Sequence, residues 1–198
     1  MHNRIYDSIC EVIGGTPIVR LKRIPKDHWA EILVQLESMN PGGSVKDRIA
    51  LSMIEAAERE GRLKPGGTIV EATSGNTRIG LAMVCAAKGY KAILTMPDDV
   101  NIERVALLRA YGARVILTHR SELMLGAINK AEEILREHPD YFSPSNSATQ
   151  PIHKSTARPP PRKSCILLAA KSMHSLLESV REGLPPALER SSKRRLRI

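Results

Sequence analysis

The sequence is poor in aromatic residues and in cysteine, and it has no long apolar run. Phe, Trp and Tyr make up 3% of the 198 residues, so a folded core has to be built from aliphatic side chains. The three cysteines, Cys10, Cys85 and Cys165, have neither a CxxC nor a metal-ligand spacing, and their odd number fits a reducing cytosol. Without an apolar run of membrane length or a signal-peptide core, we expect a soluble, cytoplasmic protein that holds no metal.

The formal net charge of +9 is concentrated at one end of the chain. Residues 143–198 hold eleven Lys and Arg residues against three acids, whereas residues 1–142 are close to neutral, at +1. The same tail holds seven of the 13 prolines and no aromatic side chain that could stack on a base. Nucleic-acid binding is therefore poorly supported, and we expect 143–198 to be an irregular basic tail.

The stretch N-P-G-G-S-V-K-D-R, residues 40–48, is the first candidate for chemistry. Ser44 followed by Asp47 reads as a capping box that opens a helix, with Lys46 in its first turn. The positive end of the helix dipole disfavours an ammonium there, and Schiff-base chemistry requires a free amine. The alternative is an ordinary surface lysine at the start of a helix.

A second polar stretch, E-A-T-S-G-N-T over 71–77, lies between an apolar strand pattern and a helical pattern. Backbone N–H groups and hydroxyls gather at such a strand-to-helix turn and favour an anion. The alternative is a polar turn that only caps the following helix.

Strands alternate with helices along most of the chain, which predicts parallel βαβ units in one doubly wound α/β domain. In such sheets ligands bind beyond the carboxyl ends of the strands, where residues 73–77 fall. Leu107 and Leu108 are expected to face inward, and Gly112 to end their helix. The expected strands are 18–21, 31–36, 68–70, 91–96 and 115–117, and the expected helices are 45–60, 79–88, 102–111 and 123–136.

The motifs together resemble the cysteine synthase and cystathionine β-synthase family of pyridoxal-phosphate (PLP) enzymes. The resemblance rests on G-G-S-V-K-D-R, T-S-G-N-T and M-P-D, and on I-G-G-T-P-I-V-R-L over 13–21, and it runs from about residue 10 to residue 141. It implies an incomplete tryptophan synthase β-like fold. Residues 1–36 would belong to a larger, mostly missing domain, and 37–142 would form the smaller α/β domain.

The resemblance also implies roles for individual residues. Lys46 would be the lysine that binds PLP, and Asn76 would hydrogen-bond the hydroxyl of the cofactor ring. The substrate carboxylate would be bound by the other polar-loop residues, Thr73, Ser74, Gly75 and Thr77. Intact members of the family are expected to be homodimers that act on a small amino-acid substrate.

Two departures from the family put the activity of this chain in doubt. Arg78 stands where the family has glycine, and we expect its bulk to obstruct a place where backbones approach closely. The translated chain also has no glycine loop for the cofactor phosphate, so we expect weak occupancy by PLP.

After residue 142 we interpret the tail as the product of a changed reading frame. The family motif Q-F-x-N-P-A-N-P-x-x-H-x-x-T-T is not continued there, but a neighbouring frame can spell it. Residues 144–156 can give the motif up to its histidine, and Pro159, Pro160 and Pro161 can give T-T-A. The same frame can spell a glycine loop over 178–187. As translated, 167–177 could form a weak helix.

The leading hypothesis is a cysteine synthase (O-acetylserine sulfhydrylase), which forms L-cysteine from O-acetylserine and sulfide and is impaired in this chain. One alternative is a cystathionine β-synthase-like or dehydratase activity on the same fold. The other is a non-catalytic, frameshifted fragment.

Overall fold

The structure is a computed structural model that describes residues 4–22, 31–73, 75–144 and, as backbone, 165–170. Ser74 and most of the tail lie outside these ranges. The described residues form two units, one of 4–13 and 46–144 and the other of 14–22, 31–45 and 165–170. The domain boundaries expected from sequence, at 36/37 and 142/143, concern a larger protein and stay predictions.

The first unit is built on a parallel sheet in the order β3-β4-β5. These strands are Thr68–Ala72, Lys91–Pro97 and Arg114–Thr118, with Ile69 opposite Ala92 and Leu94 opposite Val115. Phe142 extends the sheet beside β3, since its N–H donates to Thr68 O at 2.9 Å. The sheet is the parallel one that the βα alternation predicted.

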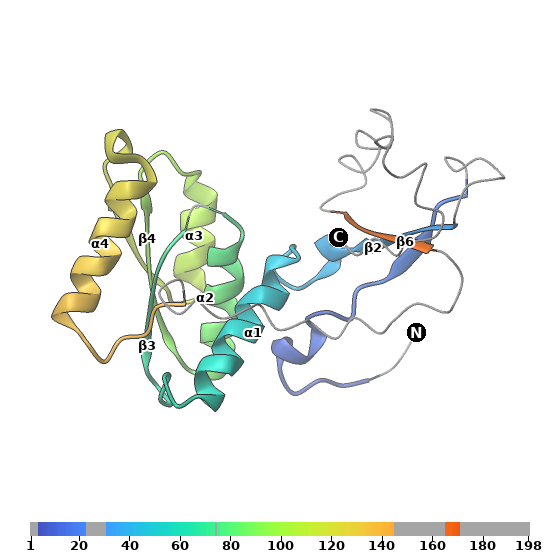
Figure 1. Cartoon of the computed structure of the whole chain (residues 1–198), viewed down its shortest axis with the longest axis horizontal. Coiled ribbons are helices and arrows are strands. Elements are labelled where there is room, and N and C mark those ends of the chain that lie inside the picture. The colour runs from blue at the N-terminus through green and yellow to red at the C-terminus, as the bar shows by residue number, and fades with distance from the viewer. Residues whose placement is uncertain (1–3, 23–30, 74, 145–164, 171–198) are drawn as a thin grey trace. The chain divides into compact units, whose positions relative to one another are not determined.

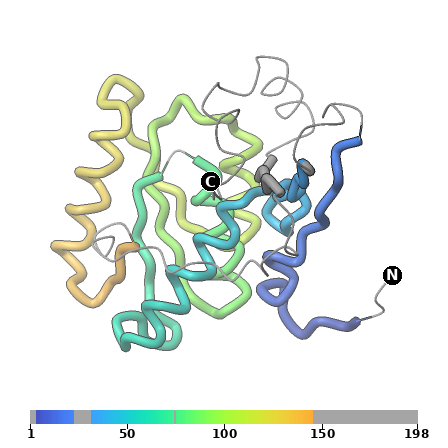
Figure 2. Tube along the Cα trace, turned by 45° about the vertical axis from the view of Figure 1, so that its right-hand side comes forward, coloured from blue at the N-terminus to red at the C-terminus, as the bar shows by residue number. Residues whose placement is uncertain are grey.

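Helices cover both faces of this sheet, as Figure 1 shows and the turned view of Figure 2 repeats. Helices α2 and α3 pack on one face and α4 on the other, while α1 packs against α2. Their bounds are α1 Lys46–Arg59, α2 Thr77–Lys88, α3 Ile102–Ala110 and α4 Leu123–Glu137. Three short 3-10 helices, at Ile9–Val12, Glu37–Met39 and Arg120–Glu122, complete the helical elements of the described ranges.

The helix ends follow the glycines that the sequence offered. Gly89 and Gly112 adopt left-handed backbone conformations, with φ of 76° and 79°, directly after α2 and close after α3. Of the two leucines expected to face inward from α3, Leu108 is fully buried but Leu107 is 39% exposed. The expectation for Leu107 was wrong, because the adjacent positions point about 100° apart around a helix and only one can face the sheet.

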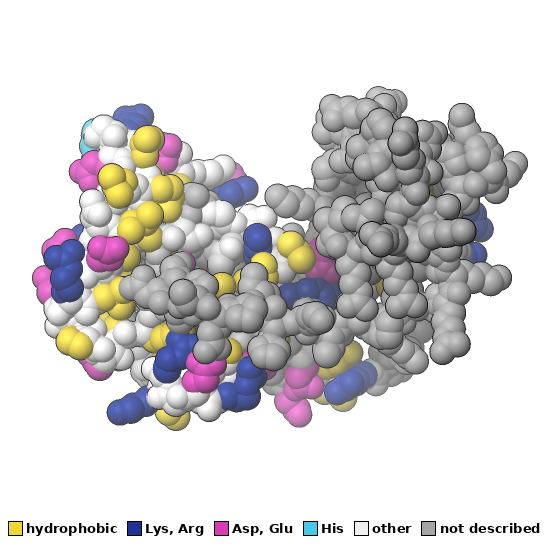
Figure 3. Space-filling view, viewed as in Figure 1, with side chains coloured by type: hydrophobic (Ala, Val, Ile, Leu, Met, Phe, Trp, Pro, Cys, Tyr) yellow, Lys and Arg dark blue, Asp and Glu magenta, His cyan; other side chains and the backbone are white. Residues whose placement is uncertain are grey.

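The outer surface of the first turns of α4 is apolar. Its first turns present three large exposed apolar side chains, where Figure 3 shows a group of yellow side chains. These residues are Leu123, Leu125 and Ile128. Within the described residues no helix is long and apolar enough to cross a membrane.

The second unit is a sheet in the order β1-β2-β6. Strands β1 (Ile18–Arg20) and β2 (Glu31–Leu36) are antiparallel, and β6 (Cys165–Ala170) runs parallel to β2. The weak helix expected over 167–177 is therefore wrong for 167–170, which pair as a strand; the rest lies outside the described residues. A run of apolar residues this short does not distinguish a strand from a helix, and the available edge of β2 decides.

Candidate active site

The polar loop 73–77 begins at the carboxyl end of β3. Glu71 is buried in the strand, and the N–H of Thr73 donates to Thr95 O of β4 at 3.3 Å. Gly75 is exposed, and helix α2 starts at Thr77. The loop therefore lies where parallel sheets place their ligands, at the edge that the sequence predicted.

Asn76 occupies the N-cap position of α2, and its carbonyl accepts from the N–H groups of Ile79 and Gly80 at 3.1 and 3.3 Å. Within the described residues, its side chain makes no capping hydrogen bond to the helix. The backbone of Asn76 therefore starts helix α2, while its side chain does not cap that helix.

Lys46 is the first residue of α1, as expected, and its side chain is half-buried. Helix α1 approaches α2 very closely at Gly80. A Cβ placed on Gly80 would lie 3.0 Å from Ala50 Cβ and 3.2 Å from both Asp47 Cα and Lys46 O. Because Gly80 is only one turn beyond Asn76, this contact brings the start of α1 beside the start of α2, and with it Lys46 beside the polar loop.

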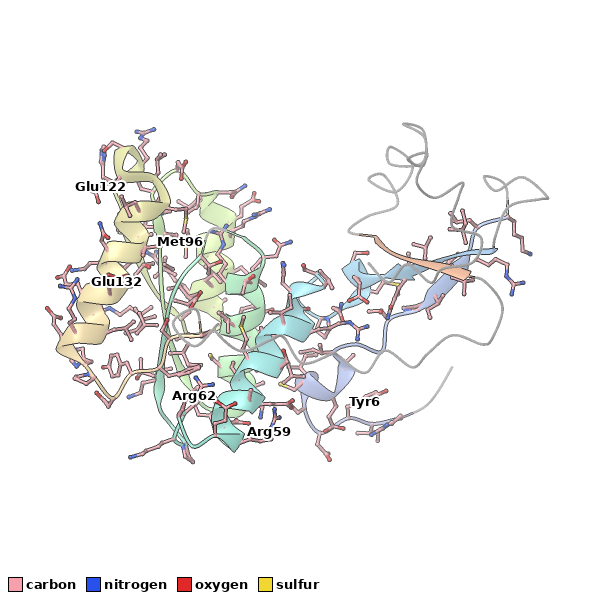
Figure 4. All side chains as sticks on the ribbon, viewed as in Figure 1. Tyr6, Arg59, Arg62, Met96, Glu122 and Glu132 are labelled. Carbon is pink, nitrogen blue, oxygen red and sulfur yellow. The ribbon has the colours of Figure 1, made fainter. Side chains whose placement is uncertain are left out.

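Arg78 is not at the close backbone approach that we expected it to obstruct. That approach is at Gly80, two residues further along α2. The Arg78 side chain is instead buried at 2% exposure, and its Nη1 lies 3.6 Å from the sulfur of Met96, which is labelled in Figure 4 inside this unit. The bulk of Arg78 is therefore accommodated in the interior, at the cost of burying a cation.

Sequence reasoning missed a buried polar network in the segment that leads to Lys46. The carboxylate of Glu37 accepts from Thr16 Oγ1 at 3.0 Å and from Asn40 Nδ2 at 2.7 Å. Asn40 Oδ1 in turn accepts the N–H of Gly14 at 2.9 Å. The network ties the G-G-T-P stretch to the N-P-G-G-S stretch within the second unit. The sequence feature that could have revealed this network is the glutamate between a strand and N-P-G-G.

Two polar side chains between β4 and α3, those of Asp98 and Asn101, have structural roles. Asp98 Oδ1 accepts the N–H of Arg120 at 3.0 Å, and Asn101 Oδ1 caps α3 by accepting the N–H of Glu103 at 2.7 Å. In the described part of the chain, no group of three His, Cys, Asp or Glu residues could hold a metal ion.

The family model described as "Pyridoxal-phosphate dependent enzyme" matches residues 9–156. The chain belongs to this family. The cysteine synthase of Staphylococcus aureus (strain Mu50 / ATCC 700699) is 57% identical over 162 residues, which are 80% of this chain and 52% of that protein. The chain thus spans about half the length of the curated relatives that it matches.

Solved structures agree with this assignment and with the predicted tryptophan synthase β-like fold. O-acetyl serine sulfhydrylase isoform 3 from Entamoeba histolytica has a TM-score of 0.67 and 44% identity, covering 73% of this chain and 44% of that one. O-ureido-L-serine synthase has a TM-score of 0.65 and 46% identity, covering 71% and 44%.

The residues present fit PLP in part. A half-buried lysine at a helix start, beside a loop rich in N–H and hydroxyl donors, suits the reactive end of the cofactor and an amino-acid carboxylate. The sequence does not offer a comparable binding loop for the phosphate group of the cofactor. Only one of the 13 glycines, Gly183, lies after residue 126, so the translated chain has no glycine-rich loop there.

Proposed function

We propose that the protein derives from a cysteine synthase that forms L-cysteine from O-acetylserine and sulfide in the cytoplasm, and that this chain carries half of its site. The packing of α1 against α2 at Gly80 is the observation that carries the proposal, because it brings Lys46 to the polar loop. We expect the activity of this chain to be impaired, because its translated sequence has no glycine-rich loop after residue 126 for the cofactor phosphate.

Different residues of the loop would bind different groups of the substrate and the cofactor, according to their chemistry. Thr73, Ser74, Gly75 and Thr77 would bind the substrate carboxylate, because several donors at a helix N-terminus converge on one anion. Asn76 would hydrogen-bond the hydroxyl of the cofactor ring and fix its orientation.

Lys46 would hold PLP covalently through its ε-amine. When bound, PLP supplies the electron sink that lets acetate leave the β-carbon of the substrate. The Lys46 amine would take the proton from the substrate Cα and later return it, after sulfide has added to the β-carbon. In the intact enzyme we expect a homodimer.

The proposal is tested by trapping PLP on the purified chain with borohydride and locating the label by peptide mass spectrometry. We expect a single labelled peptide that contains Lys46, at low occupancy, and no such label in Lys46→Ala. Lys130→Ala on α4 is the matched control and should keep the label. Equal labelling of many surface lysines, unchanged in Lys46→Ala, would contradict the assignment and favour a non-catalytic fragment.

A further inference from the structure

Arg78 is a buried cation whose hydrogen-bonding capacity is largely unused. A guanidinium carries five N–H donors and no acceptor. Nη1 contacts the sulfur of Met96, a weak acceptor, and Nε has no hydrogen-bond partner among the described residues. No ion pair of Arg78 with any described carboxylate is formed. A buried charge left in this state costs several kcal/mol.

A second cation, Arg104, acts electrostatically on the Arg78 guanidinium. Arg104 lies in the first turn of α3, which packs against α2, and it is exposed. Burial lowers the pKa of the Arg78 guanidinium, and repulsion from Arg104 lowers it further. Among the described residues Arg104 also forms no ion pair, so both positive charges lack a compensating carboxylate.

The position of the Arg78 guanidinium adds a third positive contribution. Side chains in a helix incline toward its N-terminus, and Met96, which the guanidinium touches, is the next-to-last residue of β4. The guanidinium therefore lies at the edge where α2 begins, near the positive end of that helix dipole. All three features favour an anion.

We propose that Arg78 and Arg104 bind a small anion, a carboxylate or an inorganic ion of similar size, at the start of α2. One acceptor atom would take the Arg78 Nε–H, and its charge would offset the repulsion between the two arginines. The anion has to be small because Arg78 is almost completely buried. The site differs from the amino-acid carboxylate site proposed above, which uses residues of the loop 73–77, and it needs no PLP.

The test is thermal unfolding of the full chain, without PLP, in a low-salt buffer titrated with sodium formate, sodium chloride or sodium sulfate at matched ionic strength. Formate and chloride should stabilise the wild-type chain saturably, raising the ratio of folded to unfolded protein about a hundredfold at one hundred times Kd. Sulfate, which is larger, should give only the gradual effect of screening. A response to chloride without one to formate would assign an inorganic ion rather than a carboxylate.

Three variants make the test decisive. Arg78→Met should lose the saturable response, Arg104→Met should weaken it, and Arg109→Met, at an exposed position of the same helix α3, should retain it. A wild-type response that depends on ionic strength alone would overturn the proposal. If Arg78→Met does not fold, Arg104→Met still decides, because an unchanged affinity for formate or chloride in that exposed variant would rule out the two-arginine site.

Discussion

Replacing Arg78 by methionine should stabilise the α/β unit in a buffer low in small anions. The substitution removes a charged side chain that is 2% exposed and whose Nε has no hydrogen-bond partner in the described part of the chain. Methionine keeps most of the side-chain volume and can pack against Met96, with which the guanidinium now makes only a weak contact. The wild-type charge is expected to remain, because arginine stays protonated in proteins.

The expected rise in the free energy of unfolding of Arg78→Met is the difference between two opposing effects. An unsatisfied buried polar group costs about 1–3 kcal/mol, and more when it is charged. Methionine should fill the space imperfectly, and the small void that it leaves should cost about 1 kcal/mol. A net gain of about 2 kcal/mol corresponds to a rise in Tm of about 8–16 °C for a domain of about 100 residues.

The assay is a comparison of Tm for the wild type, Arg78→Met and the exposed control Arg109→Met, whose stability should stay within about 0.5 kcal/mol of the wild type. Arg78→Gly should gain less than Arg78→Met, since glycine costs about 1 kcal/mol in a helix. If Arg78→Met melts at or below the wild-type temperature while Arg109→Met is unchanged, the guanidinium makes contacts that outweigh its burial, and the reasoning fails.

Two other contacts of α1 and α2 give measurable expectations. Gly80→Ala should lower the free energy of unfolding by about 1 kcal/mol, because the new Cβ meets backbone atoms of α1. We expect this effect to outweigh the better helix propensity of alanine. A higher urea midpoint for Gly80→Ala would contradict this. Glu58→Gln should cost roughly 0.5–1 kcal/mol at neutral pH, since Glu58 accepts hydrogen bonds from Lys88 and Tyr90. Burial raises the pKa of Glu58, but these bonds and the charges of Lys88 and Arg59 outweigh it and hold the pKa below its ordinary value. The wild-type advantage should therefore be complete above the ordinary pKa of a glutamate and be lost as the pH falls through the lower folded-state pKa. An advantage that persists in strong acid would show that the carboxylate is not its source.

Most of the α/β unit could be predicted because its local signals agree with one another. Apolar residues recur with helical spacing in α1 and α4, and glycines stand where α1, α2 and α3 end. Every strand and helix predicted between residues 68 and 137 is present, with ends that differ from the predicted ones by at most two residues. The position of the polar loop followed from the same alternation, because parallel strands bring their carboxyl ends to one edge.

What could not be predicted depends on contacts between distant segments. Whether Arg78 points outward or into the interior is decided by Met96 and α3, which lie 18 residues or more away in sequence. Likewise, Glu37 and Asn40 become a network only when Thr16 and Gly14 pack beside them. Strand β6 forms because β2 offers an edge, and nothing within 165–170 requires that pairing.

The change of reading frame predicted after residue 142 stays a prediction, and the family match adds a second, later candidate position for it. The family match continues to residue 156 in the translated frame. Four residues of this stretch stand at the spacing that the family motif N-P-A-N-P-x-x-H-x-x-T requires, and they are Asn146, Ala148, His153 and Thr156. These four matches need no shift, so a change of frame after Thr156 is the alternative to one near residue 143.

Determining the nucleotide sequence from codon 157 to codon 178 tests the later position. Restoring one base there should leave residues 143–156 unchanged and produce a glycine loop from the codons that now encode 178–187. Such a loop presents consecutive backbone N–H groups to a phosphate, which the translated tail cannot do with scattered lysines and arginines. Because 162 aligned residues are 52% of the Staphylococcus aureus relative, the repaired frame should run to about 310 residues. The repaired protein should then hold PLP on Lys46 at high occupancy. Stop codons soon after the glycine loop would instead show that its apparent spelling is a coincidence of codon choice, and the tail would need another origin.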